Sequence, residues 1–424
     1  MTPHANKLHR YLAEKIQANR PKLVEWQREL FKKAPPAFYS SVDLRDSGDK
    51  IVPVDNNLYP AGFNNICPED LRTASALFKQ EVLNRLPSQT TPHRIVVIPE
   101  THTQNLFYLE NLYYLTQIIQ EAGFEVKIGW HVTPPISEPL ILTTQSEKSL
   151  TAYPMEVQGG VLSVGDFVPD LILLNNDFSG GYPQLLDQIT QPILPSHVLG
   201  WHSRKKSEHF RYYNELATEF ARIIDIDPWI VKIESEEVEP VNFNEEIGTD
   251  QAFKTASDML KRLEQQYSER KILRKPFLFV KNNAGTYGMG IMVIHSAEEL
   301  LQMNRRTKNK MSVGKNRSQI HSLVIQEGIP TVTLIDRLPA EPVIYLFGST
   351  LIGGFLRTNS ERGVEENLNS PGMVFKKLCM SDLRDDSAEL NQPSSPPALE
   401  LVYGSIAQLS AFATGMELQA HQKK

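Results

Sequence analysis

Hydrophobic positions near the start of the chain recur with a helical period. Leu8, Leu12 and Ile16 are spaced four residues apart, which predicts an amphipathic helix before Pro21. A second helix is predicted from Pro21 through Phe31, because proline is tolerated in the first turn of a helix. Residues 1–34 are therefore expected to form a pair of helices that leads into the rest of the chain.

A different pattern follows further along, where short apolar runs alternate with amphipathic stretches. Residues 94–99 (RIVVIP) and 124–130 (FEVKIGW) predict strands, and residues 106–123 between them predict a helix that ends at Gly123. Two strands joined by a helix predict a parallel sheet. Residues 170–177 (DLILLNND) predict a further strand.

Polar loops follow two of these predicted strands, at residues 99–105 (PETHTQN) and 175–181 (NNDFSGG). Open parallel sheets bind ligands beyond the carboxyl ends of their strands, so these loops are expected to face a ligand. Residues 40–66 are also polar, rich in Asp, Asn, Gly and Pro, yet they carry apolar residues as well. They are expected to form an ordered loop or short strands.

The second half of the chain mixes strands, helices and charged stretches. Helices are predicted at residues 250–269 and 296–303, the second with Ser296 and Glu299 as a capping box, and strands at 276–281, 323–328 and twice within 342–357, turning at Gly348 and Ser349. The acidic residues 234–250 and the basic residues 304–317 are expected to be solvated loops. Residues 391–397 (NQPSSPP) are expected to link to a C-terminal helix.

Composition narrows the classes of function. The 424 residues are 41% hydrophobic and carry a formal net charge of -6 with a pI near 6.0. The chain is long enough for two or three domains and has no global attraction to nucleic acid or to an anionic membrane. It has no apolar stretch typical of a signal peptide or a membrane span. Cys67 and Cys379 have no partner motifs, so a cytoplasmic protein with two free, buried cysteines is expected.

Candidate chemistry appears first at residues 279–291 (FVKNNAGTYGMGI). Lys281 ends a predicted strand, and Gly285, Gly288 and Gly290 follow it. Glycines let a backbone fold tightly over a ligand and present N–H groups to phosphate oxygens, while the lysine supplies positive charge. The order matches neither a P-loop nor a Rossmann fingerprint. A glycine turn beside a solvated lysine fits the same letters equally well.

Two later segments add groups that a nucleotide needs. Gln326 and Glu327 end an apolar strand, where they can meet an adenine amino group. A short segment downstream gathers one cation and several oxygen-bearing side chains, namely Arg357, Asn359, Glu365, Asn367 and Asn369. Oxygen ligands of this type suit Mg²⁺ that bridges nucleotide phosphates. By itself, however, this segment is more typical of an Asn-rich surface turn.

Taken in order, these features resemble the ATP-grasp ligases, and longer phrases resemble one family within them, the proteobacterial-type glutamate–cysteine ligases. The phrases are VDLRDSGDKIVPVDNNLYPAGFNN (42–65), PETHTQNLFYLEN (99–111), LLNNDFSGG (173–181), GWHSRKKSEHF (200–210) and FVKNNAGTYGMGIM (279–292). EENLNSPG (365–372) is similar to the Glu-x-Asn metal-binding segment of the superfamily. The resemblance extends from residue 40 to residue 380 or so.

The resemblance implies an α/β fold with an ATP-grasp domain at residues 201–385. A parallel-sheet, or pre-ATP-grasp, domain would precede it at 91–200, and N-terminal helices with a substrate-binding loop segment would occupy 1–90. A linker and a C-terminal helix would occupy 386–424. The implied ATP-binding residues are Lys206, Lys281, Gly285, Thr286, Tyr287, Gly288, Gly290, Gln326 and Glu327.

The implied catalytic residues are Arg357, facing the transferred phosphoryl group, and Lys281. Glu365 and Asn367 would hold Mg²⁺. Many ATP-grasp enzymes have another acidic metal ligand shortly before Glu-x-Asn, a place taken here by Arg357 to Asn359, so Glu341 or Glu361 would substitute.

The polar loop is expected to hold glutamate. Arg45 can pair with its α-carboxylate, and Asp43 or Asp55 can take its ammonium group. The amides that could complete the pocket are those of Asn56, Asn57, Asn64 and Asn65. A purely structural polar network fits the loop equally well. His102, Asn176 and Asp177 are lesser candidates.

The function implied is an ATP- and Mg²⁺-dependent ligase that joins L-glutamate to L-cysteine through a glutamyl phosphate, the first step of glutathione synthesis. Its partners would be these small molecules, with neither nucleic acid nor membrane, and a homo-oligomer is possible. Two alternatives stay open: a ligase of the same fold for another amino acid pair, and a nucleotide-binding regulator that has lost turnover.

Overall fold

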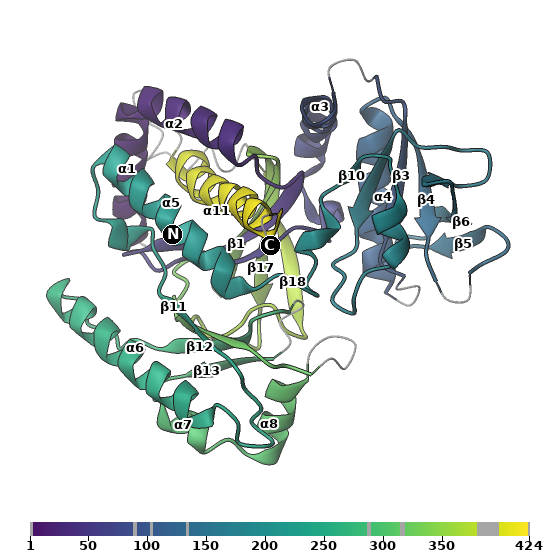
Figure 1. The fold of residues 1–424 in the computed structure, drawn as a ribbon. Coiled ribbons are helices and arrows are strands. Elements are labelled where there is room, and N and C mark those ends of the chain that lie inside the picture. The colour runs from purple at the N-terminus through teal and green to yellow at the C-terminus, as the bar shows by residue number, and fades with distance from the viewer. Residues whose placement is uncertain are drawn as a thin grey trace.

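Two six-stranded sheets and a four-stranded sheet, each flanked by helices, form most of the described structure (Figure 1). The antiparallel six-stranded sheet has the longer strands and is called the largest sheet below. The computed structural model describes residues 3–87, 91–101, 105–132, 135–285, 290–313, 319–379 and 398–422. The predicted N-terminal helices are confirmed as α1 (Pro3–Ala18) and α2 (Arg20–Lys33). Leu12, Ile16 and Leu23 are buried on their inner faces.

The largest sheet is antiparallel and combines strands from the N-terminal part of the chain with strands from its C-terminal part. Its order is β18 (Met373–Leu378), β17 (Thr350–Asn359), β16 (Leu338–Phe347), β1 (Tyr39–Asp46) and β2 (Ile51–Asn57), with β15 (Leu334–Ile335) beside β16. The polar segment 40–66 therefore contains two strands, one of the two forms expected for it. The turn at Gly348 and Ser349 between β16 and β17 is confirmed.

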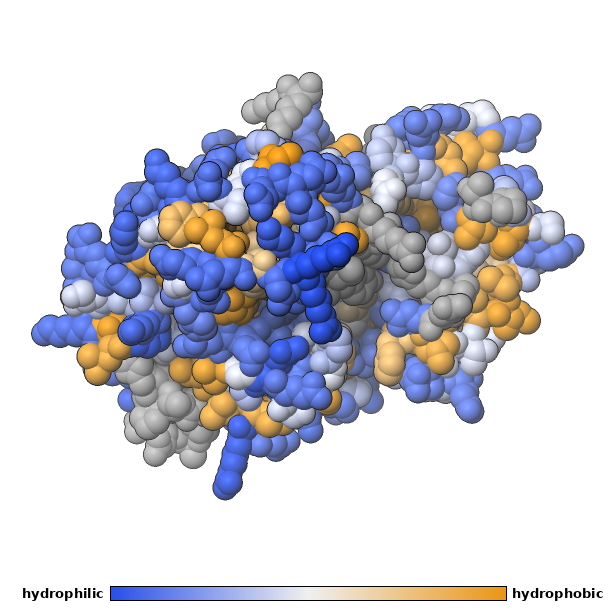
Figure 2. All heavy atoms as spheres, turned by 90° about the horizontal axis from the view of Figure 1, so that it is seen from below, coloured by the Kyte–Doolittle hydropathy of each residue, from blue (hydrophilic) through white to orange (hydrophobic). Residues whose placement is uncertain are grey.

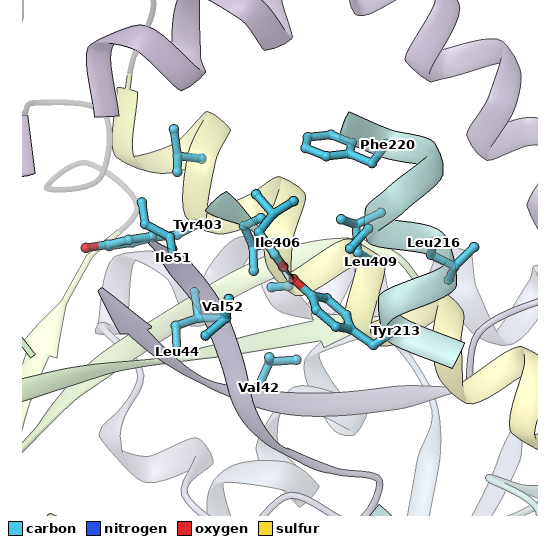
Figure 3. Close-up of a cluster of buried hydrophobic side chains, with 14 of the residues drawn as sticks. Val42, Leu44, Ile51, Val52, Tyr213, Leu216, Phe220, Tyr403, Ile406 and Leu409 are labelled. Atoms are coloured by element: carbon cyan, nitrogen blue, oxygen red, sulfur yellow. Dashed lines mark hydrogen bonds between the residues drawn. The ribbon is translucent and has the colours of Figure 1, made fainter. Parts of the chain in front are cut away.

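Alternation along these strands separates a core face from a polar face. Val42 and Leu44 of β1 point into a hydrophobic core, while Asp43 and Arg45 line a cavity on the other side. This follows from the two-residue period of a strand. Figure 3 shows the core side, where Val42, Leu44, Ile51 and Val52 pack against helices α5 (Lys206–Ile224) and α11 (Ala398–Gln422).

The predicted parallel sheet is confirmed. Its order is β10 (Ile193–Leu194), β9 (Leu171–Asn175), β3 (Arg94–Pro99), β4 (Glu125–Trp130), β6 (Ser149–Pro154) and β5 (Leu140–Thr143), and only β5 is antiparallel to its neighbour. Helix α4 (Leu106–Glu121) connects β3 to β4 as expected, and Asn105 caps it by accepting from the Tyr108 N–H at 3.1 Å. One hydrophobic core joins this sheet, α3 (Pro68–Arg85) and the largest sheet.

Short elements complete this half of the chain. They are the hairpin β7 (Glu156–Gln158) and β8 (Val161–Ser163) and the 3₁₀ turns η1 (Phe63–Asn65), η2 (Gln184–Gln188), η3 (His197–Leu199) and η4 (Pro228–Ile230).

The third sheet is antiparallel, in the order β11 (Ser235–Val238), β14 (Leu323–Glu327), β12 (Leu278–Asn282) and β13 (Ile291–Ile294). The predicted helix at 250–269 is confirmed as α6 (Thr249–Glu269) and packs on this sheet. The predicted helix is α7 (Glu298–Leu301), but its N-cap is Ala297 and no side chain caps it, so the predicted capping box was wrong. Only one of its two bonds is found in the described residues, from the Ser296 N–H to Glu299 Oε1 at 3.1 Å.

Two expectations for this region were wrong. The acidic stretch 234–250 is not entirely a loop, because residues 235–238 form β11 by backbone pairing with β14. The basic run 304–317 is not a loop over its described part, which forms α8 (Arg305–Ser312) with Asn304 as its N-cap. In both cases the deciding contacts come from distant residues, since β11 needs β14 and α8 buries Met311 in the core of this region.

The expectation that the two cysteines are free was also wrong. Cys67 and Cys379 form a disulfide with a Cα–Cα distance of 5.2 Å. The bond ties the residue before α3 to the residue after β18, across 312 positions of sequence. Their proximity follows from the packing of α3 against β17, which no local motif announces.

Surface polarity agrees with the absence of a membrane-spanning pattern in the sequence. Within the described ranges, no helix combines the length and the apolar character needed to cross a bilayer. On the face drawn in Figure 2, hydrophilic side chains dominate and hydrophobic ones occur in separate patches.

Candidate active site

A cavity lies where the polar face of the largest sheet meets the third sheet. Asp43, Arg45, Asp55, Glu341 and Arg357 line it from the largest sheet. The third sheet contributes the side chains of β12, namely Phe279, Lys281 and Asn282. Four basic and three acidic side chains line this cavity. We call it the cationic cavity.

Lys281 is a cation of this cavity whose charged form is disfavoured by its surroundings. Its Nζ donates to the Val54 carbonyl at 3.0 Å and to Gln326 Oε1 at 2.6 Å. Burial lowers the pKa of Lys281 to about 8, and the neighbouring charge of Lys206 acts in the same direction, while Asp55 opposes it. A buried ammonium without a full complement of anions is suited to receive one.

Lys206 is placed beside Lys281 by a junction between α5 and β12. The Lys206 N–H donates to the Asn283 carbonyl at 2.8 Å, and the Ser207 N–H donates to Asn283 Oδ1 at 2.9 Å. The Lys206 ammonium forms an ion pair with Asp55. Lys206, not its neighbour Lys205, therefore lines the cavity, because Lys205 pairs with surface carboxylates.

A buried network on the largest sheet forms the opposite wall. Arg357 Nη1 lies 2.6 Å from Asp43 Oδ2 and 2.8 Å from Glu341 Oε1, and Arg45 Nε lies 2.6 Å from Glu341 Oε2. Burial opposes ionisation of Glu341, but the two guanidinium groups lower its pKa. Burial raises the pKa of Asp43, and Glu341 and Asp55 raise it further, although Arg357 opposes this. Arg357 Nε has no hydrogen-bond partner among the described residues.

Gln326 and Glu327 are both buried on β14, next to β12. Gln326 reaches the site through its bond to Lys281, and its Nε2 lacks a partner in the described part of the chain. Glu327 is held by Lys50, whose Nζ lies 2.8 and 2.7 Å from its two carboxylate oxygens. Lys50 is a residue that sequence reasoning missed, although it lies within one of the family-like phrases.

The predicted flap is described only at its two ends. Gly285 lines the cavity and leaves no room for a side chain, since a Cβ there would lie 2.5 Å from Asn282 Nδ2. Gly290 has a φ of +63°, which favours glycine. Thr286, Tyr287 and Gly288 lie outside the described residues.

The predicted metal ligands are only partly brought together. Asn367 lines the cationic cavity, as does Asn369, and Glu341 lies in its wall. Glu365 is not among the residues that line it, and residues 365 to 367 do not form the extended strand that would align their side chains.

These oxygens fit Mg²⁺ only as partial ligands. Both carboxylate oxygens of Glu341 are engaged by arginines, and Asn367 Oδ1 accepts from the Asn369 N–H at 3.0 Å. In the described ranges, the close group of three metal-type side chains is Cys67, Glu69 and Cys379, and its thiols are oxidised. Mg²⁺ usually binds through one or two carboxylates together with substrate phosphates, so a complete protein cage is not required.

The residues predicted to hold glutamate divide into two groups. Asp43 and Asp55 face the cavity, and Arg45 lines it but is also bonded to Glu341 and to the carbonyls of Val364 and Glu366. The asparagine side chains bond elsewhere: Asn57 with Tyr59, Asn64 with Asn65, and Asn176 with Phe178 and, 77 positions away, with Pro99. Asn57 also lines a neighbouring cavity. His102 lies outside the described residues.

Asn56 shows why these asparagines are not equivalent. It follows Asp55 on β2 and therefore points to the opposite face, where its carbonyl and Oδ1 accept from Arg204 at 2.8 and 3.1 Å.

A second cavity of about 130 Å³ adjoins the first. Asp43, Asp55, Arg357 and Asn369 line both cavities. Beyond this shared wall, the second cavity is lined by Glu100 and Asp177, which follow β3 and β9 in the loops expected to face a ligand, and by several aromatic side chains. Four acidic side chains and one basic side chain line it, so we call it the acidic cavity. Trp201 and Tyr59 in its wall were not predicted.

Comparisons with known proteins agree on one family. The sequence profile of a family described as glutamate-cysteine ligase matches residues 13–418. A solved structure described as a gamma-glutamylcysteine synthetase from Methylobacillus flagellatus is 35% identical, with 99% of this chain and 98% of that chain covered and a TM-score of 0.88. No match was found among curated protein sequences.

More distant solved structures add nothing to this result. A D-alanyl-alanine synthetase A from Vibrio cholerae is 9% identical over 76% of this chain and 82% of its own, with a TM-score of 0.35. A glutathione synthetase-like effector from Globodera pallida is 11% identical over 88% and 80%, with a TM-score of 0.34. Both TM-scores are too low to carry an argument about the fold.

Proposed function

The chain belongs to the glutamate–cysteine ligase family, and on that premise we propose that the cationic cavity is where ATP activates glutamate for ligation to cysteine. The observation that supports this most is the convergence of Lys206, Lys281 and Arg357, from three separate elements, on one cavity with an excess of positive charge. A triphosphate needs such an excess, and this chain has no global positive charge to supply it.

The reaction has two steps. The γ-carboxylate of glutamate attacks the γ-phosphorus of ATP, which forms γ-glutamyl phosphate and releases ADP. The cysteine amine then attacks the acyl carbon, a C–N bond forms, the C–O bond to phosphate breaks, and inorganic phosphate leaves. The two protons lost by the ammonium group pass to the leaving phosphate and to solvent.

The residues of the cavity act by position and charge and form no covalent intermediate. Lys281 and Lys206 neutralise the phosphates, and Arg357 faces the transferred phosphoryl group. Gln326 lies beside Lys281, where its amide nitrogen, which has no partner among the described residues, can meet the nucleotide. Asn367, with Glu365 or Glu341, would hold Mg²⁺, which would neutralise phosphate charge.

Nucleotide entry requires movement between the sheets. The cationic cavity has a volume of about 40 Å³ and does not enclose a whole nucleoside triphosphate. We expect the third sheet to move away from the largest sheet to admit ATP and to close again, which would exclude water from the acyl phosphate.

ADP release from the purified full-length protein tests the proposal. We expect sustained release with ATP, Mg²⁺, glutamate and cysteine together, and no sustained release when either amino acid is replaced by serine or alanine. Release with a different pair would establish the first alternative, a ligase for other amino acids. ATP binding without any release would establish a nucleotide-binding regulator and contradict the proposal.

Neighbouring lysines provide a matched pair for the site. Lys206→Met is expected to lower kcat/KM for ATP at least a hundredfold, because it removes a charge from the cavity. Lys205→Met removes the same charge from the surface, one position away, and is expected to change kcat/KM for ATP less than twofold. Equal effects of the two substitutions would contradict the placement of the triphosphate.

A further inference from the structure

We infer that the acidic cavity is the binding site for the acceptor amino acid, cysteine, an inference that rests on the proposed function. The cavity is open to the reacting groups, since it shares Asp43, Asp55, Arg357 and Asn369 with the cationic cavity. A nucleophile in the acidic cavity therefore adjoins an acyl phosphate formed in the cationic one. Its volume of about 130 Å³ suits one small amino acid.

Charge distinguishes the two substrates. Glutamate carries two carboxylates and one ammonium group, and its γ-carboxylate must reach the phosphates. Four carboxylates and one arginine line this cavity, and Lys206 pairs with Asp55 at its wall, so acidic groups still outnumber basic ones and disfavour such an anion. Cysteine carries one ammonium group and one carboxylate, so it has no net charge to be repelled. Its ammonium group matches Asp43 and Asp55 at the shared wall.

The same wall offers the cysteine carboxylate a buried N–H donor on Arg357, although Asp43 and Glu341 already balance the charge of that guanidinium group. Arg357 is 8% exposed, lines both cavities, and its Nε has no acceptor among the described residues. This buried donor is an observation independent of the acidic side chains. A carboxylate bound to this N–H group would lie next to the wall where the cysteine amine must react.

The remaining wall suits a thiol. Tyr345, Phe355 and Phe375 line the cavity from the largest sheet, and Met373 lies beside them. Sulfur makes favourable contacts with aromatic rings, whereas a second carboxylate would lose its hydration there. Glu100 and Asp177 complete the lining, where their carboxylates attract the cysteine ammonium group and disfavour an acidic acceptor.

Steady-state kinetics of charge variants test this inference. Asp177→Asn and Glu100→Gln are expected to raise KM for cysteine about tenfold and to leave KM for glutamate and ATP within twofold, because each removes one charge from the acidic cavity only. Asp166→Asn removes the same charge from a side chain that is 99% exposed and should change none of these constants. Met373→Ala, at an exposed position on edge strand β18, is expected to raise KM for cysteine about threefold without a risk to folding.

Hydroxylamine separates this inference from the proposed function. It traps γ-glutamyl phosphate as the hydroxamate and needs no ammonium, carboxylate or thiol contact. We expect Asp177→Asn and Met373→Ala to form hydroxamate at the wild-type rate. If the wild-type protein forms neither hydroxamate nor ADP, the proposed function fails. If it forms both, but the variants raise KM for glutamate or leave KM for cysteine unchanged, the acidic cavity is not the acceptor site.

Discussion

Two buried charge networks lie on opposite faces of strand β2, and they are satisfied to different degrees. On one face, Asp55 belongs to the cationic cavity, where Lys281 and Asp43 have pKa values shifted toward their neutral forms, chiefly by burial. On the other face, Asn56 joins the network that links β2, α5 and α11, which we call the helix network.

The helix network is closed. Arg204 Nε lies 2.7 Å from Glu417 Oε2, His209 Nδ1 lies 2.5 Å from Glu417 Oε1, and His209 Nε2 lies 3.1 Å from Ser410 Oγ. Burial opposes ionisation of Glu417, yet Arg204 and His209 lower its pKa to about 2.

We interpret the first network as a ligand site and the helix network as a stabilising one. In the helix network, each buried charge has a close partner inside the protein. In the cationic cavity, burial destabilises the charged form of Lys281. Buried nitrogens of Arg357 and Gln326 also lack partners in the described chain. An incompletely satisfied polar network destabilises the free protein and is retained where a ligand completes it.

The largest expected effect comes from removing the buried lysine. Lys281→Met should lower kcat/KM for ligation about a thousandfold, or about 4 kcal/mol, because the ammonium group no longer meets the phosphates. The free energy of unfolding should change by no more than about 1–2 kcal/mol, because two contributions oppose each other. Removing the buried charge stabilises the protein by about 3 kcal/mol, and losing its two hydrogen bonds destabilises it by about 1 kcal/mol each. Initial rates and urea unfolding measure the two quantities.

Lys376→Met, at an exposed position, is the control for the loss of a lysine and should match the wild type in both assays. Severe destabilisation by Lys281→Met, with activity retained per folded molecule, would make the cationic cavity a structural network like the other one.

The opposite result is expected in the helix network. Glu417→Gln should lower the free energy of unfolding by about 3 kcal/mol, because Arg204 then lacks its buried counterion. Rates measured well below the melting temperature should stay within about threefold of the wild type. Glu239→Gln, which removes a half-exposed carboxylate, should cost less than about 1 kcal/mol. A Glu417→Gln protein as stable as the wild type would remove the contrast between the two networks.

Acid should act mainly through the helix network. The native pKa of Glu417 lies below its ordinary value of 4.5, so the stability it contributes is fully present above that pH and is lost as the pH falls toward 2. Between pH 5 and pH 3, the stability difference between the wild type and Glu417→Gln should shrink by about 2 kcal/mol. Denaturant unfolding of both proteins at each pH measures this, and a constant difference would refute the lowered pKa.

High pH should lower activity mainly through the cationic cavity, and this is the smallest of the expected effects. Lys281 in the free protein loses its proton near pH 8, so kcat/KM for ATP should fall about tenfold for each pH unit above that value. Lys281→Arg keeps its charge and should show no such fall, whatever its absolute rate. The same alkaline limb in both proteins would assign the titration to another group.

Helices and strands were predicted best where a hydrophobic period continued over many residues or where neighbouring elements packed on each other. The strand–helix–strand unit from β3 to β4 and the helix α6 follow from hydrophobic spacing that the chain carries within a few turns. Strand β11 and helix α8 were missed, because their charged sequences become ordered only through distant partners.

The site was predicted unevenly for the same reason. Lys281, Lys206, Arg357 and Asn367 do meet at one cavity, as the family resemblance implied. The roles of Arg45 and Glu327 could not be read, because each has a buried partner about 300 positions away, Glu341 for Arg45 and Lys50 for Glu327. The acidic cavity was invisible as a unit, although two of its carboxylates lie in loops that were predicted to face a ligand.

The sequence by itself determined the fold class, the family and the kinds of side chain available for phosphate, because these depend on local periodicity and on contiguous phrases. Only the tertiary structure decided which face of β2 each polar residue occupies, that Cys67 meets Cys379, and that one cavity is cationic and its neighbour acidic. Electrostatic character depends on distances between residues far apart in sequence, and folding alone sets those distances.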